Sequence, residues 1–433
     1  MIKTNKYIRL ITALLLFTFQ KPSAESAETI APPDAAELAA KSAVLMDASS
    51  GAYLFAKNPD MPVPPASLAK LMTIYAGQKL AALRGVSLDE PVPLPPESWA
   101  VNQPPRSSLM FLAQGQIVTL RELFLGLAIP SGNDAAVAVA LRFAPSIAQF
   151  ADVMNNEAAR LGLKKTRFVE PSGIDENNIT TAAEFARFCR EYIKAYPENL
   201  PEYHTVPEFA YPQAHNLSGN LQKKPGTIKQ VNHISILNSY PGADGLKTGY
   251  IDESGYNLAA TALRDGTRYI AVILGVPAEL GPRWGDRART EDARKLFDYG
   301  FSNFRTLRVT LPPIRDAKIW KGRQNRLPVR PALLTDAGMA AAINNGAELS
   351  VTIPKERGDD VRIETTYIAG LCAPLAAGMK TGALVLSDSA GVLATISLLG
   401  QEDIQRAGAI KRFFHSLAMF FRGIKALPPV QNG

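Results

Sequence analysis

Hydrophobic residues fall in two kinds of pattern along the chain before residue 304. Short apolar runs separated by turn residues occur in "AVLMDASSGAYLFAKN" (43–58), with a Ser-Gly turn, and in "YNLAATAL" (256–263) and "RYIAVILGV" (268–276), joined by "RDG", and they predict strands connected by short turns. Apolar residues spaced three or four apart predict helices between these strand regions and after them. The predicted helices cover 66–83, 119–129, 134–143, 147–161, 181–196 and 289–301.

Two of these helices carry start signals. Prolines in "PVPPAS" precede the helix at 66–83 and place Ser67 in its first turn. Thr181 is followed three residues later by Glu184, which is the spacing of a capping box. Strands, a block of helices, strands again and a covering helix are typical of an α+β fold, with helices on both faces of an antiparallel sheet. We assign this domain to residues 38–303.

Residues 304–400 have a different texture. Short alternating runs such as "LRVTLPP", "AELSVTIP" and "VRIETTYI" are separated by Gly, Pro and Asp turns. This pattern predicts a small all-β domain, a sandwich or a barrel.

The tail at 404–428 is amphipathic. Its apolar residues fall at helical spacing, whereas its basic residues lie mostly on the opposite face. The apolar set is Ile410, Phe413, Phe414, Leu417, Phe420, Phe421, Ile424 and Leu427, and the basic set is Lys411, Arg412, His415, Arg422 and Lys425. We expect a helix that lies in a membrane interface. The alternative is a terminal helix packed on the protein or on a partner.

The first 26 residues resemble a secretory signal. Lys3, Lys6 and Arg9 precede the apolar run Leu10–Phe19, and small residues follow in "SAESA". The run is short for a membrane-spanning helix, so we expect cleavage, with an uncleaved anchor as the alternative. In both cases the body of the protein is exported.

Charge and composition exclude several classes of function. The net charge is +7, but the basic residues without nearby acids lie at the two ends, so no basic groove for nucleic acid is expected. The four histidines have no metal-ligand spacing and no phosphate-binding glycine loop is present, so we expect no metal and no cofactor. Cys189 and Cys372 fall in different predicted domains, and the sequence leaves open whether they pair.

Candidate chemistry begins with Ser67 and Lys70. Two residues three apart on a helix share a face, so the hydroxyl and the amine can meet. A serine needs a base to become a nucleophile, and a lysine serves as that base when burial and a nearby cation lower its pKa. No other serine in the chain has a lysine three residues later.

Two further motifs fit this pair, and each occurs twice. Ser131-Gly132-Asn133 lies between two predicted helices, whereas Ser218-Gly219-Asn220 lies in a polar loop and is interpreted as a turn. Lys247-Thr248-Gly249 precedes a predicted strand and offers a cation, a hydroxyl and close backbone approach. Lys380-Thr381-Gly382 falls in the all-β region, where we interpret it as a polar turn.

The ordered set "PASLAKLMT", "SGNDAA" and "DGLKTGY" resembles the serine-type D-alanyl-D-alanine carboxypeptidases, the low-molecular-mass penicillin-binding proteins. "SSLMFLAQGQ", "SGYNLAATA" and "RKLFDYGF" extend the resemblance over 43–301. It implies a β-lactamase/transpeptidase-like fold followed by a β-domain spacer and an amphipathic anchor. It also implies a location at the periplasmic face of the inner membrane, with peptidoglycan stem peptides and β-lactam antibiotics as binding partners.

The resemblance also implies roles for single residues. Ser67 would be the acylated nucleophile, Lys70 its general base and Ser131 a proton relay. The substrate would be bound by Asn133, Lys247, Thr248, Gly249, Tyr250 and Arg289, with the backbone N–H groups of Ser67 and Tyr250 as the oxyanion hole. The reaction implied is acyl transfer to Ser67 with loss of the terminal D-alanine, then hydrolysis.

Two segments depart from the family pattern. "EPSGID" begins with Glu170 where relatives usually have Asn-Pro-His-Gly-Leu, and "VNHISIL" keeps only Asn232 of an Asn-Arg-Asn pattern. These departures bear on substrate preference and deacylation more than on the type of reaction.

Three alternative functions are compatible with parts of this pattern. A class A-like β-lactamase needs a deacylating Glu with Asn four residues on, but Ile174 occupies that position after Glu170. An endopeptidase that cuts cross-links would use the same machinery. A non-catalytic wall-binding membrane protein would be the third, although every motif residue is present here.

Overall fold

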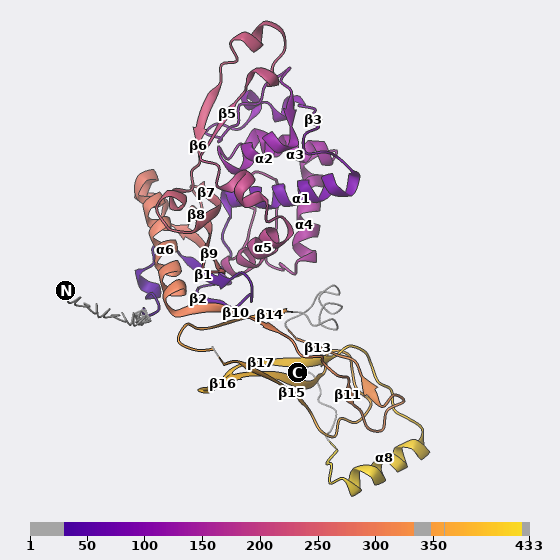
Figure 1. The fold of residues 1–433 in the computed structure, drawn as a ribbon. Coiled ribbons are helices and arrows are strands. Elements are labelled where there is room, and N and C mark those ends of the chain that lie inside the picture. The colour runs from indigo at the N-terminus through magenta and orange to yellow at the C-terminus, as the bar shows by residue number, and fades with distance from the viewer. Residues whose placement is uncertain (1–29, 333–347, 359, 427–433) are drawn as a thin grey trace, which may run out of the picture.

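The computed structural model describes residues 30–332, 348–358 and 360–426. The predicted signal segment and the end of the tail, including Leu427, lie outside these ranges. Figure 1 shows a larger α+β unit, a smaller β unit beside it and a terminal helix beyond.

The larger unit is built on a five-stranded antiparallel sheet with the order β2-β1-β9-β8-β7. The strands are β1 (Ser42–Asp47), β2 (Tyr53–Lys57), β7 (Ala243–Ile251), β8 (Gly255–Arg264) and β9 (Thr267–Val276). The strands predicted from the apolar runs are therefore present, and β7, which carries Lys247-Thr248-Gly249, forms one edge of the sheet.

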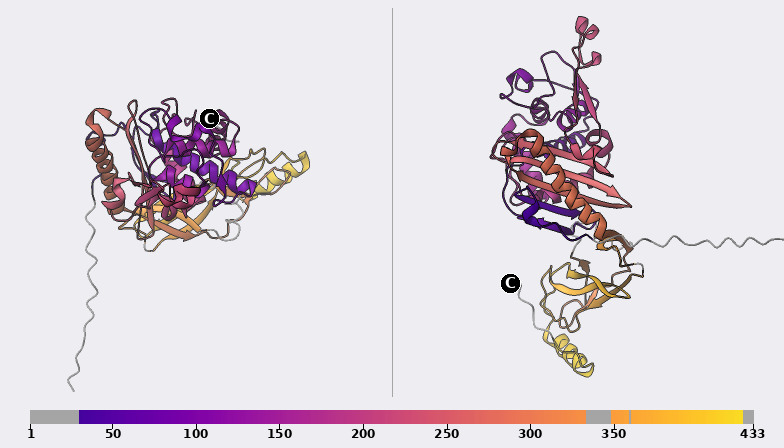
Figure 2. Two further views of the ribbon diagram at one scale, coloured as in Figure 1. Left: turned by 90° about the horizontal axis from the view of Figure 1, so that it is seen from above. Right: turned by 90° about the vertical axis from the view of Figure 1, so that its left-hand side faces the viewer.

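Helices cover both faces of this sheet, as the sequence predicted. The long helix α6 (Gly281–Asn303) crosses one face, which is clearest in the right-hand view of Figure 2. The helical block packs on the other face and consists of α1 (Ala69–Arg84), α2 (Leu120–Ala128), α3 (Asn133–Phe143), α4 (Ile147–Arg160) and α5 (Ala182–Ala195).

Strand β1 contributes side chains to the hydrophobic cores on both faces of the sheet. All six of its residues are buried, and neighbouring side chains point to opposite faces. Leu45 belongs to the core under α6 with Phe297, whereas Val44 belongs to the core of the helical block. A sheet with two covered faces needs such continuously apolar central strands.

The predicted capping box at the start of α5 forms only in part. The Thr181 hydroxyl accepts a hydrogen bond from the Glu184 N–H, but the Glu184 carboxylate accepts from Lys165 N and Thr166 Oγ1 instead of returning to Thr181. The Glu184 carboxylate therefore bonds residues outside α5 and not the backbone at the start of its own helix. A complete capping box stands at the start of α2, between Thr119 and Glu122.

The smaller unit consists of short antiparallel strands around its own apolar core. Strand β10 (Phe304–Thr310) pairs with β14 (Glu348–Pro354), and β11 (Ala317–Lys318) pairs with β12 (Arg326–Leu327). A four-stranded sheet has the order β13 (Val329–Pro331), β17 (Gly391–Gly400), β16 (Lys380–Asp388) and β15 (Arg362–Tyr367).

The interpretation of Lys380-Thr381-Gly382 as a turn was wrong. These residues begin strand β16, where Thr381 is fully buried and its hydroxyl donates to the Leu398 carbonyl at 3.0 Å. A register shift between Lys380 and Gly382 interrupts the pairing with β17. The triplet therefore has a structural role in the β unit.

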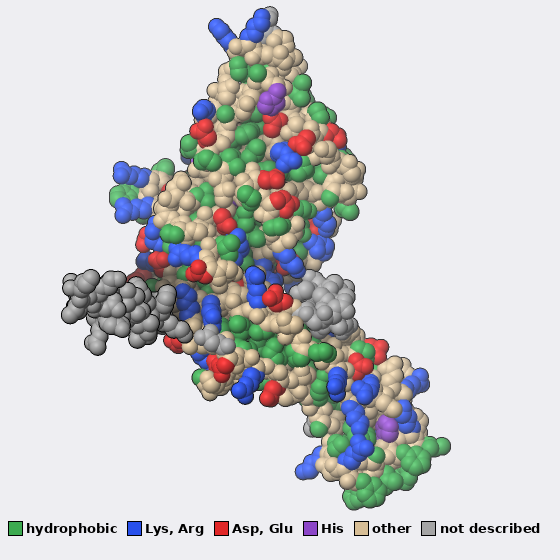
Figure 3. Space-filling view, viewed as in Figure 1, with side chains coloured by type: hydrophobic (Ala, Val, Ile, Leu, Met, Phe, Trp, Pro, Cys, Tyr) green, Lys and Arg blue, Asp and Glu red, His purple; other side chains and the backbone are tan. Residues whose placement is uncertain are grey.

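Helix α8 (Ala409–Phe421) turns its apolar residues outward. Phe413, Phe414, Phe420 and Phe421 are between 61% and 79% exposed, and they form the green tip in Figure 3. The other side of α8 contacts the β unit, since His415 Nδ1 accepts from Lys321 N at 2.7 Å.

Among the described residues, no single helix is long and apolar enough to cross a membrane. Only α3 and α4 taken together have that length and apolarity, and they are bent by 85° relative to each other. Cys189 and Cys372 are both free thiols.

Candidate active site

Ser67 lies in a short 3-10 turn, Ala66–Leu68, directly before α1. Ala66 has a φ of 51°, a region that residues with a side chain seldom adopt. Gly173 and Gly249 pack closely against this turn. A Cβ atom added to Gly173 would lie 1.9 Å from the Ala66 oxygen, and one added to Gly249 would lie 3.1 Å from Ser67 N. The surroundings therefore fix the turn that carries the hydroxyl.

The Lys70 side chain is completely buried beneath this turn. Its amine donates to Ser67 Oγ at 2.9 Å, to Asn133 Oδ1 at 2.8 Å and to the Ser172 carbonyl at 2.6 Å. The spacing of three residues thus brings hydroxyl and amine together as expected. The three acceptors leave the amine one defined position.

Burial lowers the pKa of Lys70 to about 7, although the negative charges of Glu170 and Asp134 oppose the shift. Removing a cation from water disfavours its charged form, so the amine loses its proton far more easily than an exposed lysine does. Near neutral pH, Lys70 therefore exists in both protonation states, which a general base requires.

Asn133 and Asp134 begin α3 and shape one wall of the site. Asn133 Nδ2 donates to Ser107 Oγ at 3.1 Å, while its Oδ1 faces Lys70. The Asp134 carboxylate accepts from Met110 N and Leu112 N. These hydrogen bonds connect the segment "SSLMFLAQGQ" (107–116) to the Ser131-Gly132-Asn133 motif.

Ser131 occupies the sharp link between α2 and α3, with a φ of 62°. Its hydroxyl oxygen is buried and, among the described residues, has no hydrogen-bond partner. A buried hydroxyl without a partner inside the protein is free to bind a water molecule or a group of the substrate.

Strand β7 forms the opposite wall and carries the third motif. The Lys247 side chain is 1% exposed, and its pKa lies well below the ordinary lysine value because of burial and the nearby cations Lys70 and Arg289. Lys247 Nζ donates to the Thr248 carbonyl at 3.1 Å. The site therefore contains two buried lysines on opposite walls.

Arg289 reaches β7 from helix α6. Its guanidinium donates to the backbone oxygens of Gly249 at 3.1 Å and Asn257 at 3.0 Å, and it pairs with Asp286. Arg289 does not line the cleft; it holds the strand that does.

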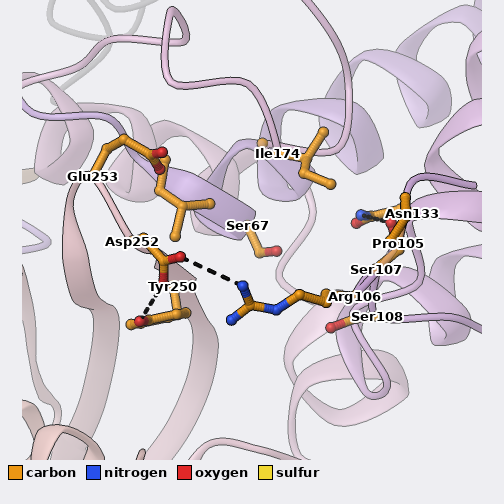
Figure 4. A pocket seen from close by; sticks show the side chains of 12 residues that line it. Ser67, Pro105, Arg106, Ser107, Ser108, Asn133, Ile174, Tyr250, Asp252 and Glu253 are labelled. Carbon is orange, nitrogen blue, oxygen red and sulfur yellow. Dashed lines mark hydrogen bonds and ion pairs between the residues drawn. The ribbon is translucent and has the colours of Figure 1, made fainter. Parts of the chain in front are cut away.

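The cleft is open and occupies about 230 Å³ beside Ser67 (Figure 4). Arg106 reaches across its mouth toward Asp252, which also accepts from the Tyr250 hydroxyl at 2.6 Å. The lining residues are Ser67, Pro105, Arg106, Ser107, Ser108, Asn133, Gly173, Ile174, Tyr250, Ile251, Asp252 and Glu253.

Several of these residues were not predicted from the sequence. Arg106 and Asp252 belong to none of the three motifs. They are recognised as site residues only because they form an ion pair across the cleft. The Ser172 carbonyl on Lys70 is a backbone contact, which no pattern of side chains announces. Ser218 lies beside the 3-10 turn Gly219–Lys223, outside the cleft lining, which agrees with its interpretation as part of a turn. Within the described ranges no cluster of His, Cys, Asp or Glu is arranged to bind a metal ion.

Fold and site together define a class. A serine paired with a buried lysine at the start of a helix, beside the edge strand of a helix-covered antiparallel sheet, is the arrangement of a serine-type acyl hydrolase.

Comparisons with known proteins agree with this class. The family model for D-alanyl-D-alanine carboxypeptidase matches residues 27–278. D-alanyl-D-alanine carboxypeptidase DacD of Escherichia coli is 31% identical over 420 residues, covering 95% of this chain and 99% of that protein.

Two solved structures extend the likeness. Penicillin-binding protein 5 of Haemophilus influenzae has a TM-score of 0.67 and 29% identity, covering 87% of this chain and all of that one. Penicillin-binding protein D2 of Listeria monocytogenes, solved with ampicillin bound, has a TM-score of 0.51 and 29% identity over 62% of this chain and all of that one. The chain belongs to the D-alanyl-D-alanine carboxypeptidase family and is a penicillin-binding serine peptidase.

Proposed function

We propose that Ser67 is the nucleophile of this carboxypeptidase and Lys70 its general base. The neutral Lys70 amine takes the hydroxyl proton while Ser67 Oγ attacks the carbonyl carbon of the penultimate D-alanine. The observation that carries this assignment is the 2.9 Å contact between Ser67 Oγ and a lysine amine that is wholly buried. Burial lowers the pKa of that amine to about 7, which suits proton transfer near neutrality.

The developing oxyanion would be stabilised by the backbone N–H groups of Ser67 and Tyr250. The close approach of Gly249 to Ser67 N supports this, because it brings the β7 backbone alongside the nucleophile. Collapse of the intermediate breaks the peptide bond, and the leaving amine takes up a proton. We assign its delivery to Ser131, which gives its hydroxyl proton to the amine and takes up the proton that Lys70 removed from Ser67.

The substrate would lie along β7, between that strand and Asn133. Lys247 supplies positive potential and Thr248 a hydroxyl for the terminal carboxylate, while Asn133 binds the peptide. Arg289 contributes by holding the Gly249 carbonyl and so the strand itself. Hydrolysis of the Ser67 ester then releases the shortened stem peptide. A β-lactam would acylate the same hydroxyl and leave a slowly hydrolysed ester.

Labelling with a fluorescent penicillin tests the nucleophile. The wild type is expected to become covalently labelled, whereas Ser67→Ala is not. The matched control is Ser218→Ala, which changes the serine of the second Ser-Gly-Asn copy and should label like the wild type. Labelling of Ser67→Ala would refute the assignment.

We further propose that the mature protein works in the periplasm at the inner membrane. The division into 1–26 as signal, 38–303 as peptidase domain, 304–400 as spacer and 404–428 as anchor belongs to this proposal. Its support is the outward-facing set of phenylalanines on α8, next to basic residues that anionic lipid attracts.

A further inference from the structure

Glu170 opens the segment in which this chain departs from the family pattern, and its carboxylate organises that segment. Oε2 accepts from the N–H and the hydroxyl of Ser172, both at 2.6 Å. Oε1 accepts from Gly173 N and from Asn178 Nδ2, again at 2.6 Å, and from Asp175 N at 3.5 Å. One side chain thereby fixes the loop at residues 170–178.

This loop is pressed against the nucleophile. Thr73 on α1 donates to the Pro171 carbonyl at 2.6 Å, and the Ser172 carbonyl accepts from Lys70 Nζ at the same distance. Gly173 packs so tightly on Ala66 that no Cβ fits between them. Movement of the loop would therefore change one of the three acceptors of the Lys70 amine.

Both oxygens of Glu170 already accept two short hydrogen bonds each from the loop. Glu170 is thus badly placed to activate a deacylating water, which is the role a β-lactamase glutamate would need.

We propose that Glu170 is a positioning residue: it keeps the Ser172 carbonyl on the Lys70 amine, and its negative charge acts on that amine. The inference rests on the proposed role of Lys70 as the general base. A neutral amide at this position could accept hydrogen bonds but would bring no charge.

The charges that face Lys70 come from three elements. Glu170 on the loop and Asp134 on α3 favour the charged amine. Lys247 on β7 also faces Lys70, whose charge helps to lower the pKa of Lys247. Beyond Lys247 lies Arg289, which is paired with Asp286. Removal of the Glu170 charge leaves the effect of burial opposed by Asp134 alone, so the amine should lose its proton at lower pH.

The test is the rate of acylation by a fluorescent penicillin, measured from pH 5 to 10. Glu170→Gln, which keeps the size of the side chain and loses its charge, should move the acid-side midpoint downward by roughly 1 pH unit. Its plateau rate should also fall, by about tenfold, because the amide cannot accept at both ends. Glu170→Asp keeps the charge and shortens the reach, so it should lower the plateau with little change in midpoint.

Asp292→Asn is the matched control, because this carboxylate accepts from Ala39 N and Ala40 N under the other face of the sheet. It should leave the midpoint unchanged. If Glu170→Gln does not fold, as judged by thermal unfolding, Glu170→Asn is the second neutral variant.

A neutral variant that loses rate at an unchanged midpoint, or that behaves like the wild type, would overturn the inference. A wild type that is not acylated at any pH would instead refute the proposed function, so the two failures are distinguishable.

Discussion

At the scale of single residues, the proposed proton transfer from Ser67 depends on the burial of Lys70. Its pKa lies near 7 because desolvation outweighs the attraction of Glu170 and Asp134. The base must be neutral, so the acylation rate of the wild type should rise as pH increases through about 7 and then level off. Stopped-flow or gel-based labelling between pH 5.5 and 9 measures this. A rate that falls over this range would contradict the role of Lys70.

Lys247 and Lys380 stand in identical Lys-Thr-Gly triplets but in different surroundings. Lys247 is buried opposite Lys70, whereas Lys380 is an exposed residue of β16 in the other unit. Lys247→Ala should reduce penicillin labelling at least a hundredfold, because it removes a buried amine that donates a hydrogen bond inside the site. Lys380→Ala is its matched control and should label within about twofold of the wild type. Equal labelling of both variants would contradict the assignment of the triplet.

Gly173 tests how tightly the nucleophile turn is held. Gly173→Ala would place a methyl group 1.9 Å from the Ala66 oxygen, at a φ of 85°. The turn must move, so acylation should fall at least tenfold and stability by roughly 1–3 kcal/mol. The control is Gly162→Ala, which also has positive φ, 71°, but nothing within 4 Å of the added carbon.

The comparison of the two alanine variants separates backbone strain from the clash. Denaturant unfolding gives the stability change, and penicillin labelling gives the functional one. Equal losses of acylation in both variants would mean that contact with Ala66 does not matter.

At the scale of elements, short apolar runs bounded by turns predicted the strands, and helical spacing predicted most helices. The apolar runs were recognisable because β1, β8 and β9 are buried on both faces, and the helical spacing because the helices of the block share one apolar core. Where local and tertiary partners compete, the sequence was less informative. Glu184 turns to Lys165 and Thr166 rather than to its own helix terminus.

Much of the candidate site could also be predicted, because Ser67, Lys70 and Asn133 are joined by side chains within recognisable motifs. The remainder depends on backbone groups and on long-range packing. The Ser172 carbonyl and the partners of Arg289 are set by how distant segments meet, so no local pattern reveals them.

Helix α8 carries a prediction of its own. Replacing Phe413, Phe414, Phe420 and Phe421 by Ser should abolish co-sedimentation with vesicles that contain anionic lipid, because the apolar face is lost. Val392→Ser, which alters an exposed apolar residue on β17, is the control and should keep binding. Unchanged binding of the fourfold variant would contradict the anchor proposal, as would retention at membranes after deletion of residues 410–433.

At the scale of the whole molecule, Asp47 connects the two units. Its Oδ2 accepts from the hydroxyls of Thr306 on β10 and Thr352 on β14, both at 2.8 Å. The β unit is thereby attached at the end of β1, and Figure 1 shows the larger unit and α8 on opposite sides of the β unit. This arrangement is compatible with the proposed role of the β unit as a spacer between the peptidase unit and the membrane surface proposed for α8.

The most direct test of the central claim is release of D-alanine from a diacetyl-Lys-D-Ala-D-Ala peptide by the purified protein. The account predicts that the wild type releases one D-alanine per peptide, that Ser67→Ala releases none, and that β-lactam turnover is slow by comparison. A wild type that turns over β-lactams rapidly but releases no D-alanine would contradict it.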